Sequence, residues 1–168
     1  MPEPAFYQCH ACHHSMDDLR WAREGGTLAL PPGSIRLNDA SLQLLTIALE
    51  VLQPEQALQL SSAVNALHQG SVRSHSLVLA EAAKLERFLN QLAVPLSSGR
   101  YSIDQLQSLR LALLMAAGDG NFRHFTAAEQ AFMAVETLSI SLADEKRYKQ
   151  ILDAWFETMK DENSFVPK

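Results

Sequence analysis

Residues 102–117 read SIDQLQSLRLALLMAA, and this stretch has the features of a single amphipathic helix. Ser102 and Gln105 stand at the spacing of a capping box, in which each side chain satisfies the free backbone amide of the other residue. A mostly apolar run follows, without glycine or proline, as far as Ala117. The pattern predicts a helix from about residue 102 to residue 117.

Similar signals on both sides of this stretch predict further helices and no strand. Helix-capping residues, prolines, glycines and apolar positions at helical spacing mark their ends and faces. The predicted helices cover about residues 38–52, 54–70, 74–92, 102–117 and 126–138, with a last helix that follows Ser141 and carries Trp155. We therefore expect an all-α protein, an orthogonal bundle of six helices.

In the first half of the chain, several residues predict where individual helices begin or end. Gly70 is expected to take the left-handed position after a helix, and His68 to stand in the last turn of that helix, where a partial positive charge is favourable. Ser74 is expected to begin the next helix. Pro95 and the SSG at residues 97–99 are expected to close it, because a proline lacks the amide that a helix interior requires.

The second half carries two more candidate capping boxes. Thr126 with Glu129 forms a box that predicts a helix start, and Ser141 with Asp144 forms a weaker one. Aromatic and large apolar residues at helical spacing in this half are expected to form the core. They are Phe132, Met133, Trp155 and Phe156.

The two halves of the chain resemble each other weakly. Short matches relate residues 42–49 to 106–113 at an offset of 64, and residues 55–57 to 129–131 at an offset of 74. A longer loop around Asp119 accounts for the difference between the two offsets. Two pseudo-symmetric three-helix units are one interpretation, and chance similarity between helices is the other.

Composition and charge limit the class of protein. The chain has 168 residues, of which 47% are apolar, and this suffices for an ordinary hydrophobic core. Its net charge of −5 argues against nucleic acid as a partner. The longest apolar run is residues 111–117, which is too short for a membrane span. The first twenty residues lack the pattern of a secretory signal, so we expect a cytoplasmic protein without a membrane partner.

Two domains of unequal character are expected. Residues 1–37 contain four of the seven prolines and three of the seven glycines, which predicts an irregular N-terminal arm. Residues 38–168 form the helical domain.

The arm contains a dense cluster of metal-binding residue types, FYQCHACHH at residues 6–14. Cys9 and Cys12 have the C-x-x-C spacing of a zinc knuckle, and zinc prefers four nitrogen or sulfur ligands. His13 or His14 is a candidate third ligand. The fourth ligand must then be a distant histidine, water or a residue of a second chain, and the distant candidates are His68, His75 and His124.

Three other interpretations of this cluster stay open. A thiol-disulfide role for Cys9 and Cys12 needs a lowered thiol pKa, which a neighbouring protonated histidine or a helix N-terminus could provide. Residues 9–13 also match the C-x-x-C-H spacing of covalent haem attachment, which belongs to exported proteins. The last interpretation is a tail that binds metal only adventitiously.

Residues 38–80 are poor in charge. Only Asp39, Glu50, Glu55 and Arg73 carry a charge there, and uncharged polar residues such as glutamine fill the positions between the apolar ones. Such helix faces indicate helices that are covered on more than one side, by the second half of the chain or by a partner chain. We expect a protein partner and a homodimer formed through residues 38–80. A glutamine-rich, solvated surface is the alternative.

No motif for catalysis emerges from the sequence. It has no nucleophile elbow, phosphate-binding loop or zinc-protease helix. The sequence thus predicts a non-catalytic interaction or regulatory protein with a structural zinc site in its arm. The alternative is a thiol-disulfide redox protein that uses the pair Cys9 and Cys12.

Overall fold

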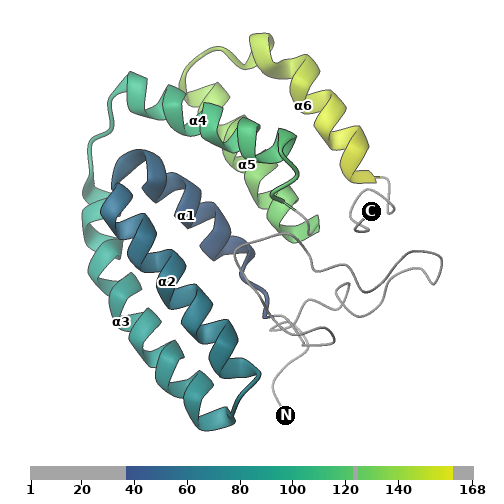
Figure 1. Cartoon of the computed structure of the whole chain (residues 1–168). Helices are drawn as coiled ribbons and strands as arrows, with labels where there is room; N and C mark the ends of the chain where they lie inside the picture. Colours follow the sequence, from purple (N-terminus) through teal and green to yellow (C-terminus); the bar gives the residue numbers. More distant parts are fainter. Residues whose placement is uncertain (1–36, 123–124, 161–168) are drawn as a thin grey trace, which may run out of the picture. The chain divides into compact units, whose positions relative to one another are not determined.

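The computed structural model describes residues 37–122 and 125–160, which form six α-helices and no strand (Figure 1). The prediction of an all-α fold with six helices is confirmed. The helices are α1 (Ala40–Leu52), α2 (Pro54–Ser71), α3 (His75–Ser98), α4 (Ile103–Gly118), α5 (Phe125–Ser141) and α6 (Glu145–Lys160). No helix in these two ranges is long and apolar enough to cross a membrane. The predicted arm, apart from Leu37, lies outside the described residues.

The described residues fall into two compact units. The first unit comprises residues 37–39 and 55–100, and the second comprises residues 40–54 and 101–160. Helices α2 and α3 belong to the first unit, whereas α1, α4, α5 and α6 belong to the second.

The first unit is a helical hairpin with a tight turn. Gly70 lies inside α2, so the expectation of a left-handed cap at this position is wrong. Gly70 instead lies where α2 packs closely on the start of α3. A Cβ atom at this position would lie only 3.3 Å from the backbone of Leu77 and Val78. A glycine therefore allows the two helices to approach each other beside the turn.

Helix α3 begins as predicted and ends later. The Ser74 side chain accepts a hydrogen bond from the Leu77 amide at 3.2 Å, which is the geometry of an N-cap. The helix then continues through Pro95 to Ser98, so it ends at the predicted SSG of residues 97–99 and not at Pro95. Pro95 stands in the last turn, where it removes only one backbone hydrogen bond. The hydroxyl of Ser98 donates to the Val94 carbonyl there at 2.7 Å.

The second unit is built on three helices that contact one another, α1, α4 and α5, while α6 packs on α5. Leucine, alanine and valine side chains of these helices form its core, which Met159 and Leu152 of α6 complete. Trp155 lies against this core and contacts the rings of Phe122 and Phe132. Of the predicted core residues, Phe132 and Trp155 pack there, whereas Met133 and Phe156 are exposed. Helical spacing does not distinguish a buried face from an exposed apolar one.

Helix α4 confirms its predicted capping box. The Ser102 hydroxyl accepts from the Gln105 amide at 3.2 Å, and the Gln105 side chain accepts from the Ser102 amide at 2.9 Å. At the other end, Gly120 has a φ of 70° and its amide bonds the Ala117 carbonyl, while the Asn121 amide bonds the Ala116 carbonyl. These two bonds define a Schellman motif with glycine in the left-handed position.

The other two predicted boxes are wrong. Helix α5 begins at Phe125, so Thr126 is already helical and is not its cap. The Ser141 hydroxyl bonds the Thr137 carbonyl one turn earlier in its own helix, at 2.8 Å, rather than the backbone of Asp144. A serine or threonine hydroxyl near a helix end can bond either a free backbone amide of the next helix or a carbonyl one turn earlier in its own helix. The spacing of the residues does not determine which of the two bonds forms.

Candidate functional site

The predicted metal ligands Cys9, Cys12, His13 and His14 lie outside the described residues. Within residues 37–122 and 125–160, no group of three or more His, Cys, Asp and Glu side chains lies together in a way that could hold a metal ion. The described part of the chain instead contains three features of interest. They are a buried Asp–His pair, an Arg–Asp network and an apolar groove.

The Asp–His pair joins Asp39, the residue just before α1, to His68 in the last turn of α2. The Nε2 atom of His68 lies 3.1 Å from Oδ2 of Asp39. The exposed fractions are 0% for His68 and 3% for Asp39. The prediction that His68 stands in the last turn of a helix is confirmed, and its side chain continues the buried face of α2 that includes Leu60 and Val64.

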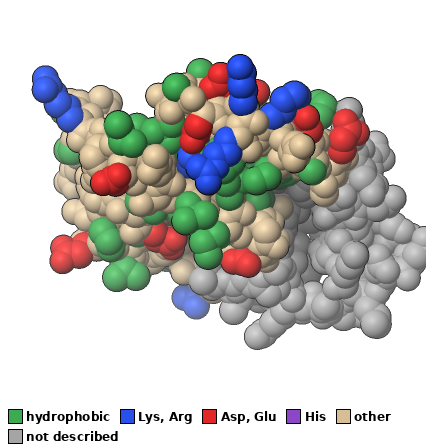
Figure 2. Space-filling view, turned by 90° about the horizontal axis from the view of Figure 1, so that it is seen from above, with side chains coloured by type: hydrophobic (Ala, Val, Ile, Leu, Met, Phe, Trp, Pro, Cys, Tyr) green, Lys and Arg blue, Asp and Glu red, His purple; other side chains and the backbone are tan. Residues whose placement is uncertain are grey.

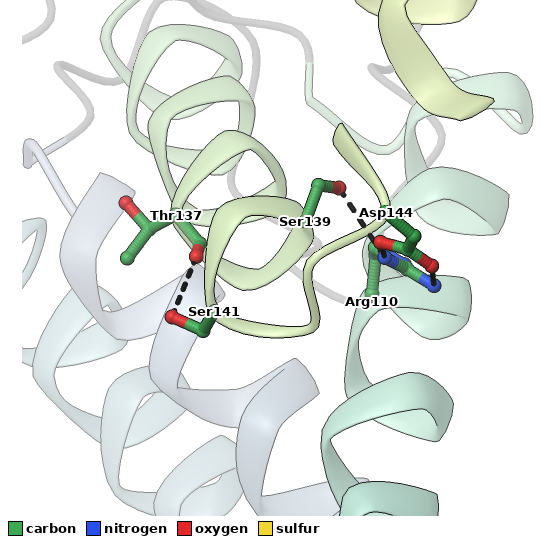
Figure 3. A network of polar contacts seen from close by, with 5 residues as sticks. All are labelled: Arg110, Thr137, Ser139, Ser141 and Asp144. Atoms are coloured by element: carbon green, nitrogen blue, oxygen red, sulfur yellow. Dashed lines mark hydrogen bonds and ion pairs between the residues drawn. The ribbon is translucent and has the colours of Figure 1, made fainter. Parts of the chain in front are cut away.

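The second feature is a network centred on Arg110 of α4 (Figure 3). Both terminal nitrogens of Arg110 donate to the carboxylate of Asp144, with Nη2 lying 2.8 Å from Oδ2. The Nη1 atom also lies 3.4 Å from the hydroxyl of Ser139. The guanidinium carbon lies 3.9 Å from the centre of the Tyr148 ring, in the geometry of a cation–π contact.

The ion pair changes the protonation behaviour of both partners. The hydrogen bond from Arg110 lowers the pKa of Asp144 below its ordinary value, and the partial burial of the carboxylate opposes this effect. The same bond raises the pKa of Arg110. The guanidinium is therefore held charged and is engaged by partners on several sides. This arrangement ties α4 to the connection between α5 and α6.

The third feature is a groove among α1, α4 and α5, with a volume of about 370 Å³. Its lining is almost entirely aliphatic and consists of Leu44, Ala48, Leu109, Leu113, Met133, Ala134, Thr137 and Leu138. The one hydroxyl in this set belongs to Thr137 and bonds the Met133 carbonyl at 2.7 Å. The groove therefore presents an apolar surface, with Met133 58% exposed at its edge.

Exposed apolar side chains also occur elsewhere on the surface. Figure 2 shows hydrophobic side chains between charged ones over one face of the molecule. In the second unit, Leu111, Met115 and Ile140 are each more than half exposed. Such residues occur singly on most proteins, so the groove is distinguished by its concave shape and its continuous apolar lining.

All three of these features were missed in the sequence. Arg110 is the one cation of α4 and stands inside an apolar run, and an arginine in such a run is a usable signal of a buried ion pair. His68 gave a weaker signal, since it falls on the same face of α2 as Ala57 and Val64. The groove gave no signal in the sequence, because it depends on how three helices pack against one another.

No protein-family model matches the chain, and neither the curated proteins nor the solved structures contain a match.

Proposed function

We propose that this protein is a non-catalytic interaction module that binds an amphipathic helix of a partner protein in the groove of its second unit. The apolar groove among α1, α4 and α5 carries this proposal. Helices with an apolar stripe bind such grooves through side chains spaced three and four residues apart. Met133 at the edge is a suitable contact residue, because methionine adapts its shape to different apolar surfaces.

The charges around the groove favour a basic partner. On α1, α4 and α5 the ionisable side chains are four carboxylates and Arg110, which Asp144 already engages. Two of these carboxylates, Glu129 and Glu136, lie on the same stripe of α5 as Met133, four residues before it and three residues after it. We therefore propose a partner helix whose apolar stripe is flanked by lysine or arginine.

Nuclear magnetic resonance of the methionine methyl groups tests this proposal. Two synthetic amphipathic peptides serve as probes, one built from leucine and lysine and the other from leucine and glutamate. We expect the basic peptide to shift the Met133 methyl signal, with weaker binding at higher salt, and the acidic peptide to bind more weakly. No shift at Met133, or equal binding of the two peptides, would overturn the proposal.

The chain offers a matched pair of variants for the same experiment. Met133 and Met115 are 58% and 59% exposed, but only Met133 lines the groove. We expect Met133→Gln to weaken binding of the basic peptide by roughly tenfold, the effect of about 1.4 kcal/mol. Met115→Gln should leave binding unchanged. Equal effects of the two substitutions would mean that the peptide does not use the groove.

We also propose that the arm holds a structural zinc ion through Cys9, Cys12 and one or both of His13 and His14. The sequence pattern supports this site. We expect close to one zinc per chain or per dimer by elemental analysis, and loss of zinc when both cysteines are replaced by serine. The redox alternative predicts a Cys9–Cys12 disulfide that cycles with a cellular reductant, and thiols that titrate normally near pH 8.5 would contradict it.

A homodimer through residues 38–80 is also part of the proposal. The exposed side chain of Leu58 on α2, beside the uncharged Gln59 and Ser62, supports it. Light scattering measures the mass directly, and a value near the chain mass of 18.6 kDa at micromolar concentration would reject a dimer. We expect Leu58→Glu to reduce any dimer to the monomer, and Glu55→Gln nearby to leave it unchanged.

The finer architecture, an orthogonal bundle of two pseudo-symmetric three-helix units, is likewise a proposal. Its support is the equal spacing of two helical hairpins. Helix α2 ends at Ser71 and α3 begins at His75, while α5 ends at Ser141 and α6 begins at Glu145, so both boundaries differ by 70 residues. An experimental structure in which α1–α3 superimpose on α4–α6 is the expected result. A lack of superposition would remove the duplication.

A further inference from the structure

The turn between α5 and α6 lacks the residues that normally end a helix. Residues 125–160 contain neither glycine nor proline, yet α5 ends at Ser141 and α6 begins at Glu145. By contrast, Gly120 takes the left-handed position after α4. The turn itself, residues 142–144, reads Leu-Ala-Asp, and only glycine and proline strongly disfavour a helix. The local sequence is therefore compatible with one continuous helix through the turn.

Ala143 is the strained residue of this turn. In residues 37–122 and 125–160 it is the one residue other than glycine with a positive φ, which is 54°. The left-handed conformation is unfavourable for a residue with a Cβ atom, whereas alanine has the highest helix propensity of all residues. Conversion of residues 142–144 to helix therefore relieves strain at Ala143. Short connections under strain favour the exchange of the attached element between two chains.

The contacts that hold α6 in place come from other helices of the second unit. Arg110 of α4 binds the Asp144 carboxylate (Figure 3), and its guanidinium stacks on Tyr148 of α6. On the same helix, the ring of Trp155 packs edge-on against Phe132 of α5, with the ring centres 5.9 Å apart. Neither Arg110 nor Phe132 belongs to α6, so a second copy of the chain can supply both partners.

Helix α6 cannot stay on its own chain once the turn has become helical. A continuous helix over residues 125–160 is about 54 Å long, and its second half points away from α5. Leu152 and Met159, which are 8% and 7% exposed in the folded chain, would then face water. The core of a second copy offers the same partners as the core that α6 has left, so exchange restores this burial.

We propose that the chain forms a dimer by exchanging α6 between two copies. In this dimer α5 and α6 of each chain form one helix, and α6 of each chain packs on α5 of the other. Arg110 of one copy binds Asp144 of the second copy, and Phe132 contacts Trp155 of the second copy. The exchange does not involve residues 38–80 as a contact surface, so this dimer is independent of the homodimer proposed above.

Substitutions at the turn test the exchange, with refolding from urea at high protein concentration and analytical ultracentrifugation as the readout. Every chain carries Leu58→Glu, so that a dimer through residues 38–80 does not contribute. Ala143→Gly relieves the turn and lowers the helix propensity of the junction, so we expect the dimer dissociation constant to rise by at least about tenfold. Ala154→Gly is the matched control and should leave the constant unchanged, because Ala154 is exposed and helical in both forms. Equal effects of the two substitutions contradict the exchange.

A pair of charge reversals tests whether α4 of one chain meets the turn of another. Arg110→Glu and Asp144→Arg each bring like charges together in a chain whose turn is closed. Exchange of α6 between one copy of each variant instead brings opposite charges together at both sites. We expect an equimolar mixture, refolded together, to form a heterodimer that is more resistant to urea than either variant alone. A mixture that behaves as the sum of its two components argues against exchange.

The wild type provides a measurement that does not depend on the folding of any variant. Chains labelled with carbon-13 are refolded together with unlabelled chains, and isotope-filtered nuclear Overhauser effects then detect contacts between different chains. We expect the dimer fraction to show a contact between Phe132 and Trp155 of different chains. A dimer in which this contact lies only within one chain overturns the inference and leaves the homodimer through residues 38–80 in place. A chain that stays monomeric at high concentration overturns both.

Discussion

Arg110 and Asp144 lie 34 residues apart and form a two-point ion pair that ties α4 to the start of α6. Arg110 is buried, whereas Asp144 is partly exposed. The ring of Tyr148 covers the guanidinium at 3.9 Å. A planar guanidinium is required for this arrangement, because it combines paired hydrogen bonds with stacking on an aromatic ring.

Replacing Arg110 by lysine should therefore destabilise the protein although it keeps the charge. We expect a loss of roughly 1.5–3 kcal/mol in the free energy of unfolding, the range for a hydrogen bond to a charged group. Urea denaturation measures it. Lys149→Gln is the control, because its pair with Asp153 is more than half exposed on both sides and should change stability by less than about 0.5 kcal/mol. Equal effects of the two substitutions would contradict the role given to Arg110.

The Arg110–Asp144 ion pair also predicts that the stability of the protein depends on pH. Arg110 lowers the pKa of Asp144 in the folded protein, below the value of about 3.9 for an unfolded aspartate. The folded state thus binds the Asp144 proton less tightly than the unfolded state does. The stabilisation is complete above the unfolded pKa and is lost as the pH falls through the folded pKa. The difference in urea midpoint between wild type and Asp144→Asn should be constant from about pH 7 to pH 5 and shrink below about pH 4. A difference that does not change with pH would contradict this account.

The ends of α4 and α5 use the same motif with different residues. Gly120 occupies the left-handed position after α4, whereas Ala143 occupies it after α5 with a φ of 54°. A left-handed conformation costs a residue with a Cβ roughly 1–2 kcal/mol, and the lower entropy of an unfolded chain with alanine in place of glycine offsets part of this cost. We expect Ala143→Gly to stabilise the protein by about 0.5 kcal/mol and Gly120→Ala to destabilise it by about 1 kcal/mol. Thermal denaturation distinguishes the two signs.

Gly70 should be intolerant of a side chain for a different reason. Its Cβ would meet backbone atoms of α3 at 3.3 Å, and backbone cannot move aside as a side chain can. Gly70→Ala is expected to cost about 1–3 kcal/mol, as for other overpacked sites. Gly118→Ala is the control, because nothing lies within 4 Å of its Cβ position. That substitution should stabilise α4 by about 0.5–1 kcal/mol. A stabilising Gly70→Ala would disprove the close approach of α2 and α3.

Two candidate capping residues should behave oppositely. Ser102→Ala removes a cap whose two hydrogen bonds are present, and it should cost about 1 kcal/mol in chemical denaturation. Thr126 lies inside α5 and is exposed, so Thr126→Ala should stabilise slightly through the higher helix propensity of alanine. A comparable loss from both substitutions would restore the capping role that the sequence suggested for Thr126.

The helical content and several helix starts can be predicted from the sequence. The signals that predict them act over only a few residues, so they can be recognised in the sequence. They are the cap at Ser102, the proline at the start of α2 and the apolar stripes. Such local signals gave wrong predictions where the same residue fits two different local structures. Pro95 was compatible with a helix end or a last turn, and Ser141 with a cap or a bond to its own helix.

The polar pairs and the groove could not be predicted from the sequence, because they form only when distant segments pack together. Asp39 bonds a histidine 29 residues away, and Arg110 bonds an aspartate 34 residues away. Nothing within a helical turn of either residue specifies its partner, because these contacts form only when separate segments pack. The same holds for Met133, whose spacing predicts a core position but whose side chain lies at the edge of a groove. Local chemistry determines that a segment is helical, while packing determines which of its faces is buried and which is available for binding.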